Sequence, residues 1–116
     1  MTNLSDVNQL IDQLNQGSVD FKKVIQLIED KYNFTPTAFT NGETVNDKNT
    51  NNGSCKIFAF GQLNNLSEQA TLNAFGDFYT IDVLQNPEKD DHQNIRNFIT
   101  FGWKGISFEQ PALALK

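Results

Sequence analysis

The most constraining feature of this sequence is an unbroken apolar run, Ile57-Phe58-Ala59-Phe60, inside a segment predicted to be helical from Ser54 to Leu63. A helix that is apolar on every side cannot lie on the surface of a domain and must be buried. The rest of the 116-residue chain therefore has to wrap around it. A chain of this length fits one domain, and it can bury roughly two thirds of its unfolded surface. Residues 1–116 are therefore predicted to form a single domain.

Two amphipathic helices are predicted before this segment, because apolar residues recur there with the helical period. The residues concerned are Val7, Leu10, Ile11 and Leu14, and then Phe21, Val24, Ile25 and Ile28. Ser5 is a candidate N-cap for the first helix, and Ser18 or Asp20 for the second. Gly17 stands where a glycine commonly ends a helix. A short connection between two such helices predicts an αα-hairpin.

A β-hairpin is predicted around Asn41-Gly42, with strands near 37–40 and 43–46. This dipeptide favours a type I′ turn, in which both central residues need positive φ. A third strand is predicted near the C-terminus, where Ile106 and Phe108 alternate with polar residues. We expect this last strand to pair with the hairpin.

Two more helices complete the predicted fold. Ser67 caps one that runs through Tyr79 and either continues over 81–84 or gives way to a separate turn there. Asp91 is the predicted cap of the last helix, which Gly102 ends. With about five helices and about three short strands, the predicted class is α+β, with the helices packed on a small antiparallel sheet.

Charge and composition narrow the function classes. The formal net charge is −5, and the nine lysine and arginine residues form no cluster, so nucleic acid is not an expected partner. No apolar run approaches the ~20 residues of a membrane span, and the polar N-terminus has no Sec-type signal. The single cysteine, Cys55, excludes an internal disulfide and a cysteine zinc site.

No cofactor is predicted. The sequence contains neither a P-loop nor a Gly-x-Gly-x-x-Gly motif, so it gives no sign of a nucleotide cofactor. The acidic loop around Glu88, Asp90 and Asp91 lacks the EF-hand pattern, and no metal site is predicted there. The sequence carries no signal for a particular oligomeric state.

Four blocks of the chain resemble the HopJ family of type III effectors. They are FTPTAFTNG at 34–42, NNGSCKIFAF at 51–60, DHQNIRNF at 91–98 and GW at 102–103. The spacing between the blocks also matches, and the similarity is weakest over the first helix.

The resemblance implies a bacterial protein from a gammaproteobacterium, located in the bacterial cytoplasm or exported through a type III secretion system. The family takes its name from an effector that Pseudomonas syringae injects into plant cells, and many relatives occur in bacteria that are not plant pathogens. No catalytic residues are established for the family, so none is carried over.

Cys55 is the first candidate for chemistry. A cysteine near a helix N-terminus has its thiol pKa lowered by the helix dipole, which favours the nucleophilic thiolate. The Gly-Ser-Cys order resembles papain-type proteases. In that case His92 is the candidate general base, and Asn94 or Asp91 is the residue that orients it. Asn51 or Asn52 is the candidate donor to the oxyanion. The alternative, which we favour, is that Cys55 fills space in the core.

A second candidate site is the polar segment before the last helix. Asp91, His92, Gln93, Asn94 and Arg96 are candidates for a binding surface there, together with the aromatic Trp103. The alternative is a capping cluster in which Arg96 pairs with a carboxylate.

Three functions follow from these features. The first is a non-catalytic, type III effector-like interaction module that binds a host or bacterial protein. The second is a bacterial housekeeping protein with a small-ligand or structural role. The third is a cysteine hydrolase or acyltransferase that uses Cys55 and His92.

Overall fold

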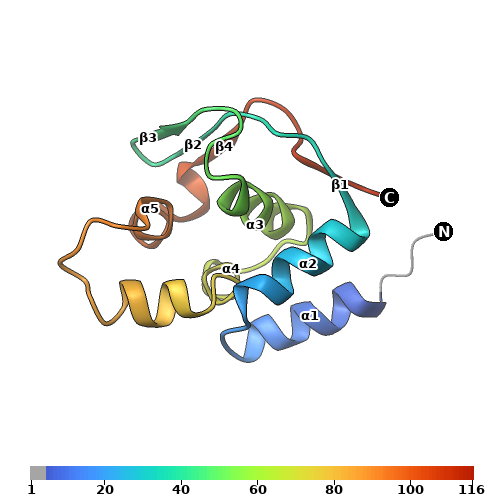
Figure 1. Ribbon diagram of the computed structural model, residues 1–116, viewed down its shortest axis with the longest axis horizontal. Helices are drawn as coiled ribbons and strands as arrows, with labels where there is room; N and C mark the ends of the chain where they lie inside the picture. Colours follow the sequence, from blue (N-terminus) through green and yellow to red (C-terminus); the bar gives the residue numbers. More distant parts are fainter. Residues whose placement is uncertain (1–4) are drawn as a thin grey trace.

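The protein was analysed as a computed structural model that describes residues 5–116 (Figure 1). Residues 1–4 of the predicted domain lie outside the described range. The elements are α1 (Ser5–Gln16), α2 (Phe21–Lys31), β1 (Tyr32–Phe34), β2 (Phe39–Asn41), β3 (Thr44–Asn46), α3 (Asn52–Leu63), α4 (Glu68–Asn73), the π-helix η1 (Phe78–Val83), α5 (Gln93–Phe101), the 3₁₀ helix η2 (Gly102–Gly105), β4 (Ile106–Phe108) and β5 (Leu113–Leu115). The predicted α+β class is confirmed.

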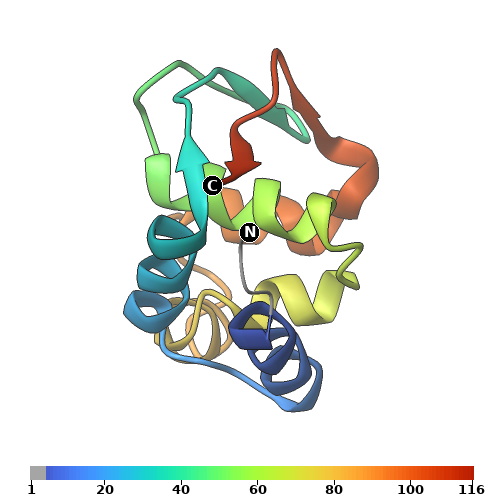
Figure 2. The ribbon, with the colours of Figure 1, turned by 90° about the vertical axis from the view of Figure 1, so that its right-hand side faces the viewer.

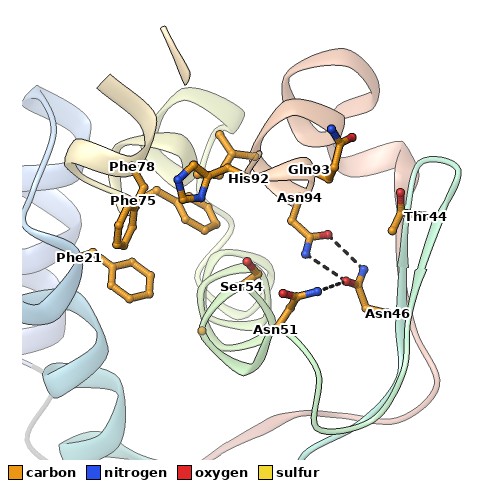
Figure 3. A pocket seen from close by; sticks show the side chains of 12 residues that line it. Phe21, Thr44, Asn46, Asn51, Ser54, Phe75, Phe78, His92, Gln93 and Asn94 are labelled. Atoms are coloured by element: carbon orange, nitrogen blue, oxygen red, sulfur yellow. Dashed lines mark hydrogen bonds between the residues drawn. The ribbon is translucent and has the colours of Figure 1, made fainter. Parts of the chain in front are cut away.

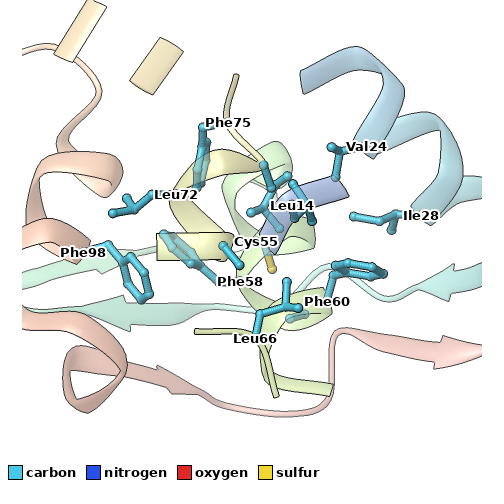
Figure 4. Close-up of a cluster of buried hydrophobic side chains, with 14 of the residues drawn as sticks. Leu14, Val24, Ile28, Cys55, Phe58, Phe60, Leu66, Leu72, Phe75 and Phe98 are labelled. Atoms are coloured by element: carbon cyan, nitrogen blue, oxygen red, sulfur yellow. The ribbon is translucent and has the colours of Figure 1, made fainter. Parts of the chain in front are cut away.

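Helix α3 is the buried centre of the fold, as its apolar run predicts. The side chains from Ile57 to Phe60 are at most 5 % exposed, and Cys55 is 1 % exposed. Figure 4 shows α3 side chains meeting those of α1, α2, α4 and α5. The Phe58 ring lies 5.0 Å from that of Phe98 and 5.5 Å from that of Phe75, which are spacings typical of favourable aromatic pairs.

The two N-terminal helices form the predicted antiparallel pair on one side of α3 (Figure 1). Asp20 caps α2, because its carboxylate accepts a hydrogen bond from the backbone N–H of Lys22. Helix α1 packs against α4, and α2 packs against α3. Both predicted helices are thereby confirmed, although α2 gives way to strand at Tyr32.

The strands form one long antiparallel ribbon in which residues 31–41 run beside residues 106–116 (Figure 2). β1 pairs with β5 and β2 pairs with β4 in a single constant register. That register places Pro36 opposite Pro111, and the ladder is interrupted at this rung because proline has no N–H to donate. The ribbon therefore appears as two sheets, of two and three strands. The β1–β5 pair was missed because three-residue strands show too little alternation.

The hairpin forms where predicted, but its turn is different. Asn41 pairs with Thr44, so the two-residue loop is Gly42-Glu43. Gly42 has a φ of +62°, whereas Asn41 and Glu43 do not have positive φ. This is the pattern of a type II′ turn, in which glycine takes the first loop position. The predicted type I′ turn on Asn41-Gly42 is therefore wrong, and Asn41 is fully buried.

The helix predicted after Ser67 is interrupted. Ser67 does cap α4 through a hydrogen bond from Ala70 N–H, but α4 ends at Asn73 and η1 begins at Phe78. Between them Gly76 has a φ of +58°, which breaks the helical geometry. A β-carbon at Gly76 would lie 2.8 Å from the carbonyl oxygen of Val19. No helix in the described part of the chain has the length and apolarity to cross a membrane.

The substitution Gly76→Ala is expected to destabilise the fold by about 2 kcal/mol or more, because alanine disfavours positive φ and its methyl group would clash with a backbone oxygen. Urea unfolding followed by circular dichroism measures the change. Gly17→Ala is the matched control, since Gly17 has ordinary φ and no heavy atom within 4 Å of its virtual β-carbon. Equal losses of unfolding free energy in Gly76→Ala and Gly17→Ala would contradict the requirement for glycine at position 76.

Candidate functional site

A pocket of about 380 Å³ opens where the N-terminal ends of α3 and α5 meet the β2–β3 hairpin (Figure 3). We call it the asparagine pocket. One wall is polar and the other is aromatic. The polar wall consists of Thr44, Asn46, Asn51, Ser54, Gln93 and Asn94, and the aromatic wall of Phe21, Phe75, Phe78 and His92.

The polar wall is held together by amide side chains. Asn46 and Asn94 each donate to the other's Oδ1, at 3.1 and 3.0 Å. Asn51 donates to the same Asn46 Oδ1 at 2.7 Å. Buried amides that satisfy one another in this way fix a single arrangement, because a lost partner would leave a polar group unpaired away from water. The wall is therefore rigid.

Asn41 extends this network below the pocket. Its Nδ2 donates to the backbone oxygen of Asn94 at 2.8 Å and to Asn94 Oδ1 at 3.0 Å. Asn41 is fully buried, and its own Oδ1 has no partner among the described residues. Asn97 adds a second connection between α5 and the hairpin, since its Nδ2 donates to the Asn41 carbonyl and to Thr44 Oγ1. The hairpin and α5, which lie far apart in the sequence, are thus joined through side-chain amides.

The aromatic wall is built from α2, the α4–η1 connection, the first residue of η1 and the residue before α5. The Phe21 ring lies 5.1 Å from that of Phe78 in an edge-to-face arrangement and 6.3 Å from that of Phe75. The His92 ring is 5.2 Å from Phe78. Phe78 is 39 % exposed, so part of its apolar surface remains uncovered. His92 Nε2 lies 3.0 Å from Asp82 Oδ2, which fixes the imidazole against this wall.

The two helices whose N-terminal ends meet the hairpin, α3 and α5, begin without a side-chain cap. Asn51 precedes α3 and His92 precedes α5, and both have left-handed backbone with φ near 50°. Neither side chain caps its helix, in contrast to Asp20 and Ser67. The prediction that Asp91 caps α5 is therefore wrong, because His92 is the residue that precedes the helix and the Asp91 carboxylate pairs with the Arg96 side chain.

Asp91 and Arg96 instead fasten the loop before α5. Arg96 NH2 lies 2.7 Å from Asp91 Oδ1, as the capping-cluster alternative expected of Arg96. The Arg96 side-chain hydrogen bond is the main reason that the pKa of the Asp91 carboxyl is lowered. Arg96 also donates to the backbone oxygens of Asn86, Pro87 and Asp91. These hydrogen bonds hold the loop in place, and neither Asp91 nor Arg96 lines the pocket.

Cys55 lies in the core and is not among the residues that line the pocket. Loss of solvation on burial raises the pKa of its thiol from 9.0 to about 11, against smaller opposing effects of a Thr37 backbone hydrogen bond and the Lys56 charge. The lowering predicted from the helix dipole is therefore wrong, since desolvation outweighs it. At neutral pH the thiol is almost fully protonated.

The other candidate residues separate into two groups. His92, Gln93 and Asn94 line the pocket, whereas Asn52, in the first turn of α3, does not. Trp103 packs elsewhere, with its Nε1 donating to the Leu66 carbonyl at 2.9 Å. Its ring closes over Gly61, where a β-carbon would approach it to 2.8 Å. Trp103 therefore belongs to the packing around the core.

Most of the residues that line the pocket carry no functional signal in the sequence, which marks only Asn51, His92, Gln93 and Asn94 among them as candidates. By local pattern Asn41 and Asn46 belong to the predicted hairpin, and Phe21 belongs to the apolar face of a predicted helix. The frequent asparagines between 41 and 52 were the available signal, but such residues are also common in turns. Among the described residues no group of three or more His, Cys, Asp or Glu side chains is placed to hold a metal ion.

The model of the HopJ type III effector proteins matches residues 7–113. The chain belongs to the HopJ type III effector family. A crystal structure of a protein of unknown function, VPA0580, is 54 % identical and superposes with a TM-score of 0.92. The match covers 100 % of this chain and 97 % of that one. No curated protein matches the chain.

Asn94→Ala is expected to lower the free energy of unfolding by about 2–3 kcal/mol, because it removes the side-chain amide to which Asn41 and Asn46 both donate and leaves the buried Asn46 Nδ2 without a partner among the described residues. Urea denaturation measures the loss. Gln93→Ala is the matched control on the neighbouring residue, whose exposed side chain donates only to the Asp90 carbonyl. Its effect should stay within about 0.5 kcal/mol. Similar values for the two variants would refute the structural role of the network.

Burial of the Cys55 thiol predicts a pH dependence. Because the thiol pKa is raised in the folded state, its contribution to stability is complete below pH 9 and is lost as the pH rises towards about 11. The loss amounts to at most about 3 kcal/mol. It is measured as the difference between the wild-type and Cys55→Ala unfolding profiles, which removes the titration of other groups. Parallel profiles, or rapid alkylation of the folded wild type by iodoacetamide at pH 7, would contradict burial.

Proposed function

We propose that this chain is a non-catalytic, type III effector-like interaction module that recognises its partner at the asparagine pocket. The observation that carries this proposal is the position of His92, Gln93 and Asn94. These residues line a preformed pocket whose polar wall is locked by buried amides, while the single thiol lies apart in the core. Rigid polar groups beside exposed aromatic surface are typical of binding sites.

The cysteine-enzyme alternative receives little support from the geometry. A nucleophilic cysteine needs a depressed pKa and access to substrate. The Cys55 thiol has a raised pKa of about 11 and is buried. His92 hydrogen-bonds to Asp82 and packs on Phe78, so its ring is engaged within the aromatic wall.

Membership of the HopJ family supports the effector part of the proposal. In this form of the function, the protein is made in the bacterial cytoplasm and exported through a type III secretion system, and its partner is a host or bacterial protein. The excess of acidic residues, which gives a net charge of −5, favours a partner with a basic or neutral surface over nucleic acid.

A secretion assay tests the effector form. A tagged chain is expressed in a strain with a working type III system and in an isogenic strain without the secretion ATPase. We expect the tagged chain in the culture supernatant of the first strain only. Retention in the cytosol of both strains would rule out the effector form and leave the binding role at the pocket intact.

The pocket itself favours a second candidate function, that of a bacterial protein which binds a small ligand. Its volume of about 380 Å³ lies within the ~300–1,000 Å³ range of small-molecule sites. In this form the chain needs no export, and the ligand takes the place that a partner's side chain would occupy in the first form.

A further inference from the structure

The asparagine pocket leaves aromatic surface uncovered on one side. Phe78 is 39 % exposed and Phe21 is half-buried, and both line the pocket. Figure 3 shows their rings, with those of Phe75 and His92, grouped on the side opposite the asparagines. A flat ring placed against them would gain stacking or edge-to-face contacts and remove apolar surface from water. The aromatic wall therefore favours a planar ligand.

The opposite side offers hydrogen-bonding groups that the fold does not use. The Ser54 hydroxyl has no hydrogen-bond partner among residues 5–116 and lies between the two walls in Figure 3. Asn51 donates its Nδ2 to Asn46, but its Oδ1 has no partner within the same range. Gln93 likewise uses Nε2 and leaves Oε1 unpaired there. These groups comprise acceptors and a hydroxyl that both donates and accepts.

The charges around the pocket argue for a neutral ligand. Among residues 5–116 no Asp, Glu, Lys or Arg lines it, and the carboxylate beside it, Asp82, is engaged by His92. A charged ligand would lose hydration without gaining an oppositely charged side chain. Amide and hydroxyl groups instead match the mixed donor and acceptor edge of a heterocycle, as asparagine and glutamine do when they recognise bases.

We propose that the asparagine pocket binds a neutral planar heterocycle, either a nucleobase or a ring of the same hydrogen-bonding class. The planes of Phe78 and Phe21 are 70° apart, so the ligand ring stacks on one and meets the other edge to face, and its polar edge is read by Ser54 and Asn51. This inference rests on the small-ligand form of the proposed function and deepens it. The ring comes from a free base or from a nucleoside, because the acidic chain disfavours a polyanionic nucleic acid.

The test is a titration of the full chain followed by amide NMR. The probes are adenine, hypoxanthine and uracil, the corresponding nucleosides, the nucleoside monophosphates, and toluene as a ring without a polar edge. We expect at least one base or nucleoside to shift the resonances of Ser54, Asn51 and Gln93 with a Kd below about 1 mM. Toluene should bind more weakly. A base that binds as well as its nucleoside identifies the ring alone as the recognised part.

Two variants examine the two walls separately. Ser54→Ala should weaken binding about 5-fold by removing one hydrogen bond. Phe78→Leu should weaken it about 5-fold to 100-fold by removing a stacking surface. Gln62→Ala, an exposed substitution outside the pocket, is the control and should leave the affinity unchanged. The amide spectra of the free variants show whether each is folded before its affinity is compared.

Several outcomes would overturn the assignment of the ligand. These are shifts that map away from the pocket, equal binding of toluene with no effect of Ser54→Ala, or a monophosphate that binds more than 10-fold tighter than its nucleoside. A complete absence of shifts with every ring would also overturn it. If a partner protein protects the same amides while no ring binds, the proposed function stands and the ligand class fails.

Discussion

The burial of α3 is the constraint on which the rest of this structure depends. Because Phe58 and Phe60 project from different sides of one helix and are both fully buried, neighbouring elements must cover α3 in several directions. Helix α2 packs against it, and the rings of Phe39, Phe98 and Trp103 lie around Phe58. Truncation of a fully buried phenylalanine typically costs ~3–5 kcal/mol, so this helix supplies a large share of the fold's stability.

The same arrangement creates the pocket. The apolar run begins only at Ile57, so the first turn of α3 is polar and lies at the edge of the core. There the covering elements separate into aromatic rings on one side and the hairpin with α5 on the other. The amides of Asn41, Asn46 and Asn94 hold the second side together. Such a network fixes the hairpin and α5 in one relative position in addition to stabilising them, because each amide has a partner in one arrangement only.

The position of Cys55 supports two opposite predictions about the reactivity of its thiol. Its place near the start of a helix favours a reactive thiolate, whereas its inward direction removes it from solvent. Burial is the larger effect and raises the thiol pKa. The polar residues that precede it, including Asn51 and Ser54, face the pocket instead. The segment that resembles a catalytic loop thus provides part of one wall of the asparagine pocket and a core residue.

The sequence by itself determined the elements whose signals are local. The apolar run predicts that α3 is buried, Ser67 is predicted as the cap of α4 and Gly102 as the end of α5, and Asp20 is one of two candidate caps for α2. Local signals also placed the hairpin, although the turn shifted by one residue because Asn41 is drawn into the buried network. The break in the helix at Gly76 and the left-handed backbone at His92 have no local signal in the sequence, because each depends on how distant segments pack.

Only the tertiary structure decided the site. Asn41 and Asn94 are 53 positions apart and hydrogen-bond directly, and Phe21 meets Phe78 across a similar separation. Each of these residues, taken in its own segment, is an ordinary turn or core residue. Helical and strand periods report which face of an element is buried, but they do not report which faces meet. The pocket exists because packing around α3 brings such residues to one place.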